Sequence, residues 1–146
     1  MNEPIQLPNR SRSFKLKRVI DGDTFEVTID LDKKIKVVET IRLANFDAPE
    51  SWRPRNKQEK AHGLKAKACA KYLLRQAQCP FLETVKYDGK YGRRIANIYI
   101  DCSDNFIMDT PKQYATLKPW VGFRSVAAIL TELNLAKLTT YEELCL

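Results

Sequence analysis

The sequence lacks the side chains on which several common active sites depend. It contains a single histidine, His62, which lies in a lysine-rich stretch with no serine or cysteine nucleophile motif near it. A surface or helix-start position is therefore the better interpretation of this histidine. The four cysteines form no CxxC pair and show no zinc-finger spacing, so free thiols are expected and a structural zinc site is not. Any reaction must therefore use carboxylates, arginines and a metal ion.

Long hydrophobic runs are also missing, and no apolar stretch is long enough to cross a bilayer. The first 15 residues lack the basic and apolar regions of a secretory signal, which predicts a chain that stays inside the cell unless a leader has been removed. With 5 glycines, 7 prolines and 44% hydrophobic residues, the composition is that of a globular protein. A chain of 146 residues fits one domain, and we expect a monomer without membrane contact.

Positive charge is in excess and is unevenly distributed. Lys and Arg number 25 against 18 Asp and Glu, which gives a net charge of +7. Residues 51–76 carry eight basic side chains and one acid, and residues 10–18 carry five basic side chains. A polyanionic partner such as a nucleic acid would explain these clusters. A solvated helix face that keeps the protein soluble would explain the first of them equally well.

Hydrophobic periodicity predicts an α+β protein that is mainly β. Apolar residues alternate in the predicted strands, whereas over 57–76 they follow helical spacing. The expected strands are 14–20, 25–31, 35–45, 81–85 and 93–100. A later helix is expected to begin after Ser125 as its N-cap and to end at Asn134. Five strands with a helix between the third and fourth are typical of an OB-fold, a five-stranded Greek-key barrel, here with two or three helices.

The barrel is predicted to occupy residues 14–146 as a single domain, after an N-terminal extension over 1–13. The periodicity fades over 101–124, which we interpret as an insertion that either packs on the barrel or covers a site. The sequence from Thr140 to Glu143 has the form of a capping box and predicts a short closing helix. The apolar face expected for the 57–76 helix consists of Leu64, Ala68, Cys69, Tyr72 and Leu73.

Three motifs place charged residues at the ends of predicted strands. The stretch VIDGDTFEV, residues 19–27, predicts a hairpin turn because Asp and Gly tolerate the positive φ of tight turns. Turn chemistry does not require its second acid, Asp23. The stretch IRLANFDAPE, residues 41–50, puts an arginine on a strand and two acids in a proline-containing loop. In KYGRR, residues 90–94, an arginine opens a strand after a glycine. Taken singly, these residues are ordinary surface charges.

Taken together and in this order, the motifs resemble the staphylococcal nuclease, or thermonuclease-like, family. The resemblance includes the 63–74 helix and the closing AAILTELNLAKL, and it covers most of residues 19–138. It implies Ca²⁺ ligands from Asp23, Asp47 and the main-chain carbonyl of Ala48. It also implies a water-activating or water-orienting carboxylate at Glu50. The other implied residues are the phosphate-binding Arg42 and Arg93, the nucleotide-contacting Lys90 and Tyr91, and a carboxylate outside the ligand set, Asp21.

The activity implied by the resemblance is calcium-dependent hydrolysis of phosphodiester bonds within DNA and RNA, by an endonuclease that leaves 3′-phosphate ends. The alternative is a catalytically inactive nucleic-acid-binding or scaffold domain on the same barrel, which has no evident need for the whole residue set. Two positions depart from the family pattern. Ala48 replaces a common threonine, which is harmless because the implied ligand is a main-chain carbonyl. Gly89 stands where many members carry an acid, so the nucleotide contacts near Tyr91 stay open.

Overall fold

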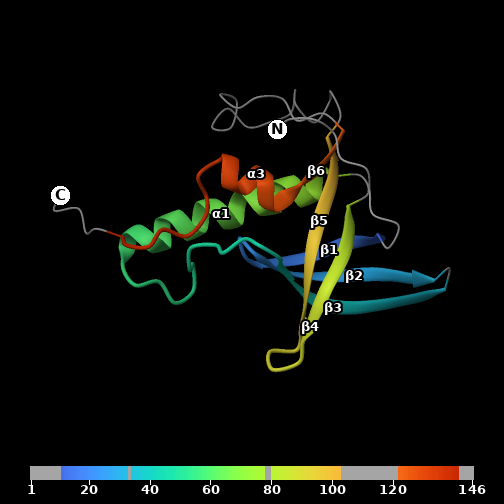
Figure 1. The fold of residues 1–146 in the computed structure, drawn as a ribbon. Helices are drawn as coiled ribbons and strands as arrows, with labels where there is room; N and C mark the ends of the chain where they lie inside the picture. The colour runs from blue at the N-terminus through green and yellow to red at the C-terminus, as the bar shows by residue number, and fades with distance from the viewer. Residues whose placement is uncertain (1–10, 33, 78–79, 103–121, 142–146) are drawn as a thin grey trace.

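A closed β-barrel with two helices packed on it forms the fold of the computed structural model (Figure 1). The structure describes residues 11–32, 34–77, 80–102 and 122–141. Its elements are β1 (Arg12–Asp21), β2 (Thr24–Asp32), β3 (Ile35–Leu43), α1 (Lys57–Gln76), β4 (Phe81–Asp88), β5 (Arg93–Cys102), β6 (Gly122–Ser125) and α3 (Val126–Glu132). Among these residues, no helix is both long and apolar enough to span a membrane.

The pairing of β3 with β5 closes the barrel. The strands follow the order β3-β2-β1-β4-β5-β6, and β3 also pairs with β5 in parallel. In Figure 1 the blue strands β1 to β3 cross the yellow-green pair of β4 and β5. The five predicted strands and the 57–76 helix are thus confirmed, together with the α+β OB-fold class.

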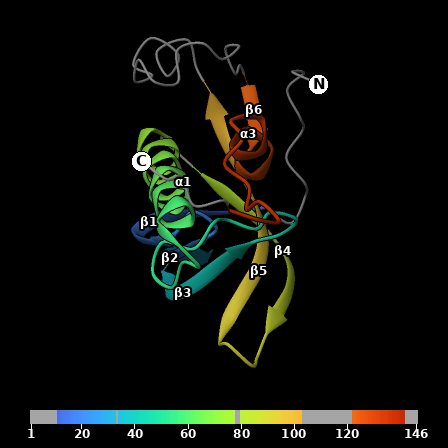
Figure 2. The ribbon, with the colours of Figure 1, turned by 90° about the vertical axis from the view of Figure 1, so that its left-hand side faces the viewer.

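The barrel interior is filled by alternate strand residues, as the sequence pattern predicted. Phe25, Val27 and Ile29 on β2 are fully buried. Both helices cover one end of the barrel, where they contact each other (Figure 2). On α3 the expected stripe is confirmed, since Val126, Ile129 and Leu130 are buried.

The apolar face predicted for α1 is partly wrong. Leu64 is 48% exposed and Ala68 is also exposed. The buried residues of α1 are Glu59, Gly63, Ala66, Cys69, Ala70, Leu73 and Leu74. Small residues allow the helix to lie close to the barrel and its loops, so volume as well as hydropathy selects the buried face.

The β1–β2 turn forms where it was predicted, but the reason given for its glycine is wrong. Within the described part of the chain, Gly92 is the one glycine with a positive φ, at 61°. Gly22 is needed instead for close packing, because a Cβ there would lie 2.8 Å from the Cβ of Ala66 and 3.1 Å from that of Ala48. The turn is therefore pressed against both α1 and the loop that follows β3.

The segment after β5 begins later and ends earlier than the sequence predicted. Asp101 and Cys102 continue β5, and the unpredicted strand β6 pairs with it from Cys102↔Gly122 to Tyr99↔Ser125. The rest of the expected insertion, 103–121, lies outside the described residues, as do 1–10 of the expected extension and the end of the expected closing helix. The division into domains stays a prediction.

Both predicted ends of the last helix are confirmed. The Ser125 hydroxyl accepts a hydrogen bond from the Ala128 N–H at 3.3 Å, which makes Ser125 the N-cap of α3. Asn134, just after the helix, has a left-handed φ of 60°. This turn directs the following residues back toward α1 and the loop after β3.

Candidate active site

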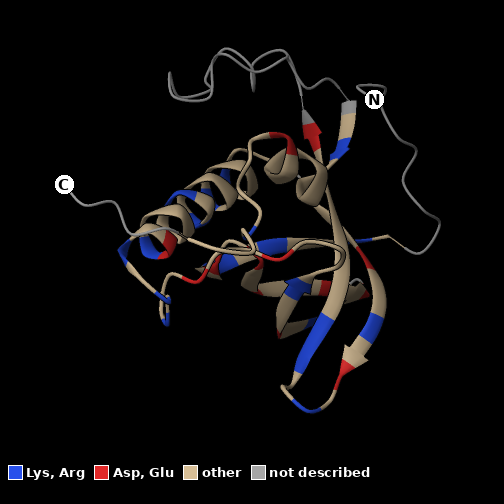
Figure 3. Ribbon diagram, turned by 60° about the vertical axis from the view of Figure 1, so that its left-hand side comes forward, with Lys and Arg blue, Asp and Glu red and all other residues tan. Residues whose placement is uncertain are grey.

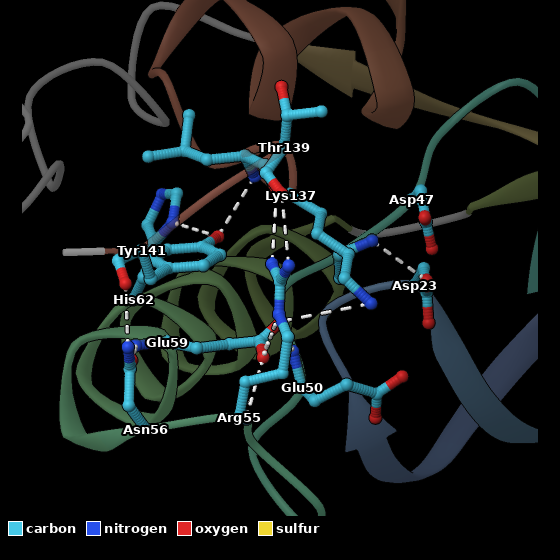
Figure 4. Close-up of polar contacts among 12 residues, drawn as sticks. Asp23, Asp47, Glu50, Arg55, Asn56, Glu59, His62, Lys137, Thr139 and Tyr141 are labelled. Carbon is cyan, nitrogen blue, oxygen red and sulfur yellow. Dashed lines mark hydrogen bonds and ion pairs between the residues drawn. The ribbon is translucent and has the colours of Figure 1, made fainter.

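Asp23 joins the β1–β2 turn to the loop after β3. Its side chain is nearly buried, and its Oδ2 accepts a hydrogen bond from the Ala48 N–H at 2.9 Å. Its Oδ1 accepts a second hydrogen bond from the Thr24 hydroxyl at 2.8 Å. The second acid of the turn therefore faces the loop that carries Asp47 and Ala48 (Figure 4).

Arg42 brings the two predicted metal-binding carboxylates together. Its Nη2 lies 3.0 Å from Oδ1 of Asp47 and 3.4 Å from Oδ2 of Asp23. Its Nη1 donates to the Leu43 carbonyl at 3.2 Å, which holds the guanidinium against its own strand. The Asp47 side chain remains 64% exposed, so this carboxylate is open to solvent.

The parallel pairing of β3 with β5 places Arg42 and Arg93 on one face. Arg42 pairs with Ile95, and Arg93 lies two residues before Ile95. Side chains two residues apart in a strand point the same way. Both arginines line an open pocket of about 510 Å³ between β3, β4 and β5, together with Ala44, Asn45, Val85, Lys86, Asp88 and Ile95.

Arg93 contributes incompletely paired positive charge to this pocket. Its Nε lies 3.6 Å from Oδ2 of Asp88, and among the described residues this buried nitrogen has no hydrogen-bond partner. Its guanidinium carbon lies 4.9 Å from the centre of the Tyr91 ring. An anion that enters the pocket would therefore meet two guanidinium groups, one of which is only loosely paired with a carboxylate.

Lys90 and Tyr91 lie in the turn between β4 and β5. The Lys90 Nζ is 5.4 Å from the centre of the Tyr91 ring, and Tyr91 is 63% exposed. Both predicted nucleotide contacts are therefore accessible beside the arginine pocket, although neither lines it.

Glu50 is half-buried and has an altered protonation equilibrium. Burial raises the pKa of its carboxyl, and the negative charge of Asp21 raises it further. The positive charge of Lys137 lowers this pKa, whereas Asp23 and Glu59 raise it. Within the described part of the chain, the Glu50 carboxylate accepts no hydrogen bond, so it is available to a water molecule.

Asp21 stands apart from the Asp23–Asp47 pair. Its Oδ1 accepts a hydrogen bond from the Ser51 hydroxyl, one residue after Glu50. The predicted role outside the ligand set is compatible with this contact, because Asp21 here fixes the loop beside Glu50.

Sequence reasoning missed Glu59, which is fully buried beneath this loop. Its Oε1 accepts hydrogen bonds from Arg55 N–H at 2.8 Å and Arg55 Nε at 3.1 Å. Its Oε2 lies 3.5 Å from the Glu50 N–H donor and 3.7 Å from Lys137 Nζ. We call Glu59 with Arg55 and Lys137 the Glu59 clamp (Figure 4).

The clamp keeps Glu59 ionised. Burial alone would raise the pKa of Glu59, but hydrogen bonds from the Arg55 backbone, the Arg55 side chain and the Glu50 N–H outweigh it, and the charge of Arg55 adds to them. The pKa therefore lies below its usual value. One sequence signal was available: Glu59 follows Asn56 by three residues, and the Asn56 side chain caps α1 by accepting from the Glu59 N–H at 3.0 Å.

The chain after α3 fastens the same region from the other side. The Lys137 N–H donates to the Asp47 carbonyl at 2.7 Å. Arg55 donates to the carbonyls of Thr139 at 2.9 Å and Leu138 at 3.1 Å. The loop with Asp47 and Glu50 is therefore held between α1 and residues 137–139 (Figure 4).

His62 belongs to this support and not to the predicted site. It lies in the second turn of α1, where its Nδ1 is 2.7 Å from the Tyr141 hydroxyl and its Nε2 is 2.8 Å from the Asn134 carbonyl oxygen. The Tyr141 hydroxyl also accepts from the Leu138 N–H at 3.0 Å. Since both ring nitrogens are engaged, His62 stabilises the end of the described chain against α1.

The oxygen ligands that the resemblance implies suit calcium. Among the described residues, no group of three or more His, Cys, Asp and Glu side chains could hold a metal ion. The implied set is smaller, with two carboxylates and the Ala48 carbonyl. Arg42 and the Ala48 N–H already hold these two carboxylates at one place. Because Ca²⁺ takes six to eight oxygens and accepts waters among them, this set fits the ion.

The fold and the charged edge of the barrel define an α+β protein of the nuclease-like OB-fold class. A model of the family described as staphylococcal nuclease homologue matches residues 40–136. The chain therefore belongs to the staphylococcal nuclease family, whose domains in general bind nucleic acid. No curated protein matches the chain. The family match begins after Asp21 and Asp23, and the pairing of β2 with β3, Thr24 opposite Arg42, is what brings the β1–β2 turn to the matched region.

Proposed function

We propose that this protein is a calcium-dependent endonuclease that hydrolyses phosphodiester bonds in DNA and RNA and leaves 3′-phosphate ends. The observation that carries the proposal is the contact of one guanidinium, Arg42, with both Asp23 and Asp47 at the edge of a pocket shared with Arg93. The site that the family resemblance implies uses both acids and both arginines at one place, and these contacts support it.

Asp23, Asp47 and the carbonyl of Ala48 would hold the calcium ion. When bound, Ca²⁺ supplies charge neutralisation at a phosphate oxygen and a site for water. Asp23 is already oriented by the Ala48 N–H and Thr24, so it needs little reorganisation. Asp47 is exposed and free to turn from Arg42 toward the ion. Asp21 fixes the neighbouring loop through Ser51 and takes no part as a ligand.

Arg42 and Arg93 bind the phosphate from two strands. In the substrate-free protein their charges are balanced by Asp23, Asp47 and Asp88, and a bound phosphate exchanges these partners for its own oxygens. The planar guanidinium donates two parallel hydrogen bonds to such oxygens. Removal of one such donor from a developing anion typically costs about 3 to 4 kcal/mol of transition-state stabilisation. Lys90 and Tyr91 contact the adjoining nucleotide from the exposed turn.

Glu50 acts on the attacking water, as its base or by orienting it. The water oxygen forms a bond to phosphorus, the bond from phosphorus to the 5′ oxygen breaks, and the leaving oxygen takes up a proton from solvent. As a base, Glu50 accepts the proton that the water loses. Burial raises the pKa of Glu50 toward the working pH, which makes the carboxylate a better proton acceptor than an exposed one.

Cleavage assays with controlled metal content test the proposal. Labelled single-stranded DNA, duplex DNA and RNA are incubated with the protein in Ca²⁺, in Mg²⁺ and in excess chelator. We expect cleavage in Ca²⁺, little in Mg²⁺, and none in chelator, because a flexible set with few carboxylates suits the larger ion. An Asp23→Asn variant should require more Ca²⁺ for half-maximal rate. Binding of nucleic acid without cleavage under all three conditions would instead support the inactive binding domain.

A further inference from the structure

An exposed tryptophan stands directly beside the candidate site. Trp52 is 75% exposed, the largest value among the exposed large hydrophobic residues of the described chain. It follows Glu50 by two residues, a span of about 7 Å at most for an extended chain. The guanidinium carbon of Arg53 lies 4.3 Å from the centre of the Trp52 ring. A large aromatic surface with an adjacent cation is therefore presented to solvent next to Glu50.

The loop that carries Trp52 is fastened on both sides of the ring. Before it, the Ser51 hydroxyl donates to Asp21, and the Glu50 N–H faces the buried Glu59. After it, the Arg55 N–H donates to Glu59 at 2.8 Å. An exposed side chain on an anchored backbone loses little further backbone entropy when a ligand binds. The solvent-facing ring is therefore suited to binding a ligand, whereas its exposure shows that it contributes little to the buried core.

The surroundings of Trp52 fit a nucleic acid strand. In Figures 1 and 2 the loop between β3 and α1 lies below α1, and the turn between β4 and β5 lies at the bottom of the picture. Figure 3 shows basic residues along α1, on the loop before it and on β5. Tyr91 is 63% exposed, and the guanidinium of Arg93 lies over its ring as that of Arg53 lies over the ring of Trp52. Aromatic platforms in a basic groove are typical of proteins that bind single strands.

We propose that Trp52 is a stacking platform for an unpaired base next to the phosphate that is cut. This inference deepens the proposed nuclease function and rests on it for the location of that phosphate. A base in a duplex already stacks on its neighbours and is paired, so its face is not available to Trp52. A base of a single strand is free to stack. Trp52 therefore gives the protein a preference for single-stranded DNA or RNA over duplex.

Binding of oligothymidylate in excess chelator tests the platform without cleavage. Trp120→Phe leaves Trp52 as the one tryptophan, and stacking of a thymine should quench its fluorescence. Trp52→Ala should raise the Kd for the single strand by roughly 5- to 150-fold, the range expected from stacking of one base. Trp52→Phe should recover part of this loss because it restores an aromatic face. The matched control is Ile35→Ala, which removes another exposed side chain, 54% exposed, at the start of β3, eight residues before Leu43 at the end of that strand.

Each outcome separates this proposal from the nuclease proposal. If the Trp52→Ala variant binds oligothymidylate as the Ile35→Ala variant does, the platform is refuted, while cleavage in Ca²⁺ would leave the nuclease proposal intact. If Trp52→Ala selectively loses single-strand binding in a protein that cuts nothing, stacking of a base on Trp52 stands, while the nuclease proposal and the placement of that base beside a cleaved phosphate fail. An equal loss for duplex and single strand would refute stacking in favour of a general effect. Wild-type protein that binds no nucleic acid in chelator refutes the platform, and if it also cuts none in Ca²⁺ the nuclease proposal fails as well.

Discussion

Gly63 gives the sharpest test of whether the position of the loop sets the activity. It lies within α1, and the carbonyl group of Glu50 rests directly on it. A Cβ at position 63 would lie 2.7 Å from the carbonyl carbon and oxygen of Glu50 and 2.7 Å from the carbonyl oxygen of Pro49. The atoms in the way belong to the backbone, so no rotation of a side chain relieves the contact. Gly63→Ala must therefore displace the loop that carries Glu50.

The size of the effect follows from this geometry. Ordinary contacts of a Cβ begin near 3.4 Å, so the loop must retreat by about 0.7 Å. A misplacement of about 1 Å can cost on the order of a hundredfold in rate, and we expect kcat to fall by about 10- to 100-fold. Stability should change less. Alanine gains about 1 kcal/mol over glycine in a helix interior, against about 1 to 3 kcal/mol for overpacking, which gives a net loss of about 0 to 2 kcal/mol.

Turnover of single-stranded DNA in Ca²⁺ and urea unfolding, measured on the same preparations, separate the two effects. Gly89→Ala is the matched control, since a Cβ at that position meets no atom within 4 Å. We expect kcat of Gly63→Ala to fall although most of the protein remains folded under the assay conditions, so that unfolding does not explain the loss. Gly89→Ala should retain the wild-type fold. A Gly63→Ala protein with wild-type kcat would show that the fit of the loop to α1 does not position Glu50.

Three further predictions concern the arginines and the Glu59 clamp. Arg42→Lys and Arg93→Lys keep the charge but lose the planar guanidinium, so each should lower kcat in steady-state cleavage by about a hundredfold. The loss of kcat in the double variant should be smaller than the product of the two single losses, because both groups act on one phosphate. A loss equal to that product would place the two arginines on separate phosphates. The lowered pKa of Glu59 stabilises the fold above the usual carboxyl pKa, and this stabilisation is lost as pH falls through the lowered value. Urea unfolding across this pH range should therefore show a flatter acid dependence for Glu59→Gln, and an unchanged slope would contradict the clamp. Lys137→Met removes a partly exposed partner of Glu59 and should cost about 1 kcal/mol in the same assay, less than Glu59→Gln; a larger loss than Glu59→Gln would contradict this order.

Elements with strong local signals could be predicted from the sequence. The helix over 57–76 has a capping side chain at Asn56 and helical spacing throughout, and its predicted bounds agree with α1. Strand alternation was equally informative for β2, whose inward residues are fully buried. Asn134 was predicted as a left-handed terminator, because asparagine tolerates positive φ better than most residues. In each case the determining interaction lies within a few residues of sequence.

Features that depend on distant contacts could not be predicted in this way. The four-residue strand β6 is too short for a periodic pattern and is defined by its pairing with β5. In the sequence Glu59 is the one acid in a basic segment, and its contact with Lys137 could not be predicted because Lys137 lies far along the chain. Gly22 was assigned to turn conformation, whereas its role depends on Ala66 and Ala48. The motifs brought the candidate site residues to attention, but closure of β3 on β5 is what places both arginines at one pocket.

The chemistry of the product ends tests directly whether this protein is a calcium-dependent nuclease. Single-stranded DNA labelled at its 5′ end is incubated in Ca²⁺ with the wild-type protein and with Glu50→Gln, and each product is treated with a phosphatase that removes 3′-phosphates. We expect wild-type fragments whose mobility shifts after phosphatase, a much slower reaction for Glu50→Gln, and no reaction in chelator. Intact DNA in every lane, or cleavage that continues in chelator at the same rate with Glu50→Gln, would contradict a calcium-dependent nuclease at this site.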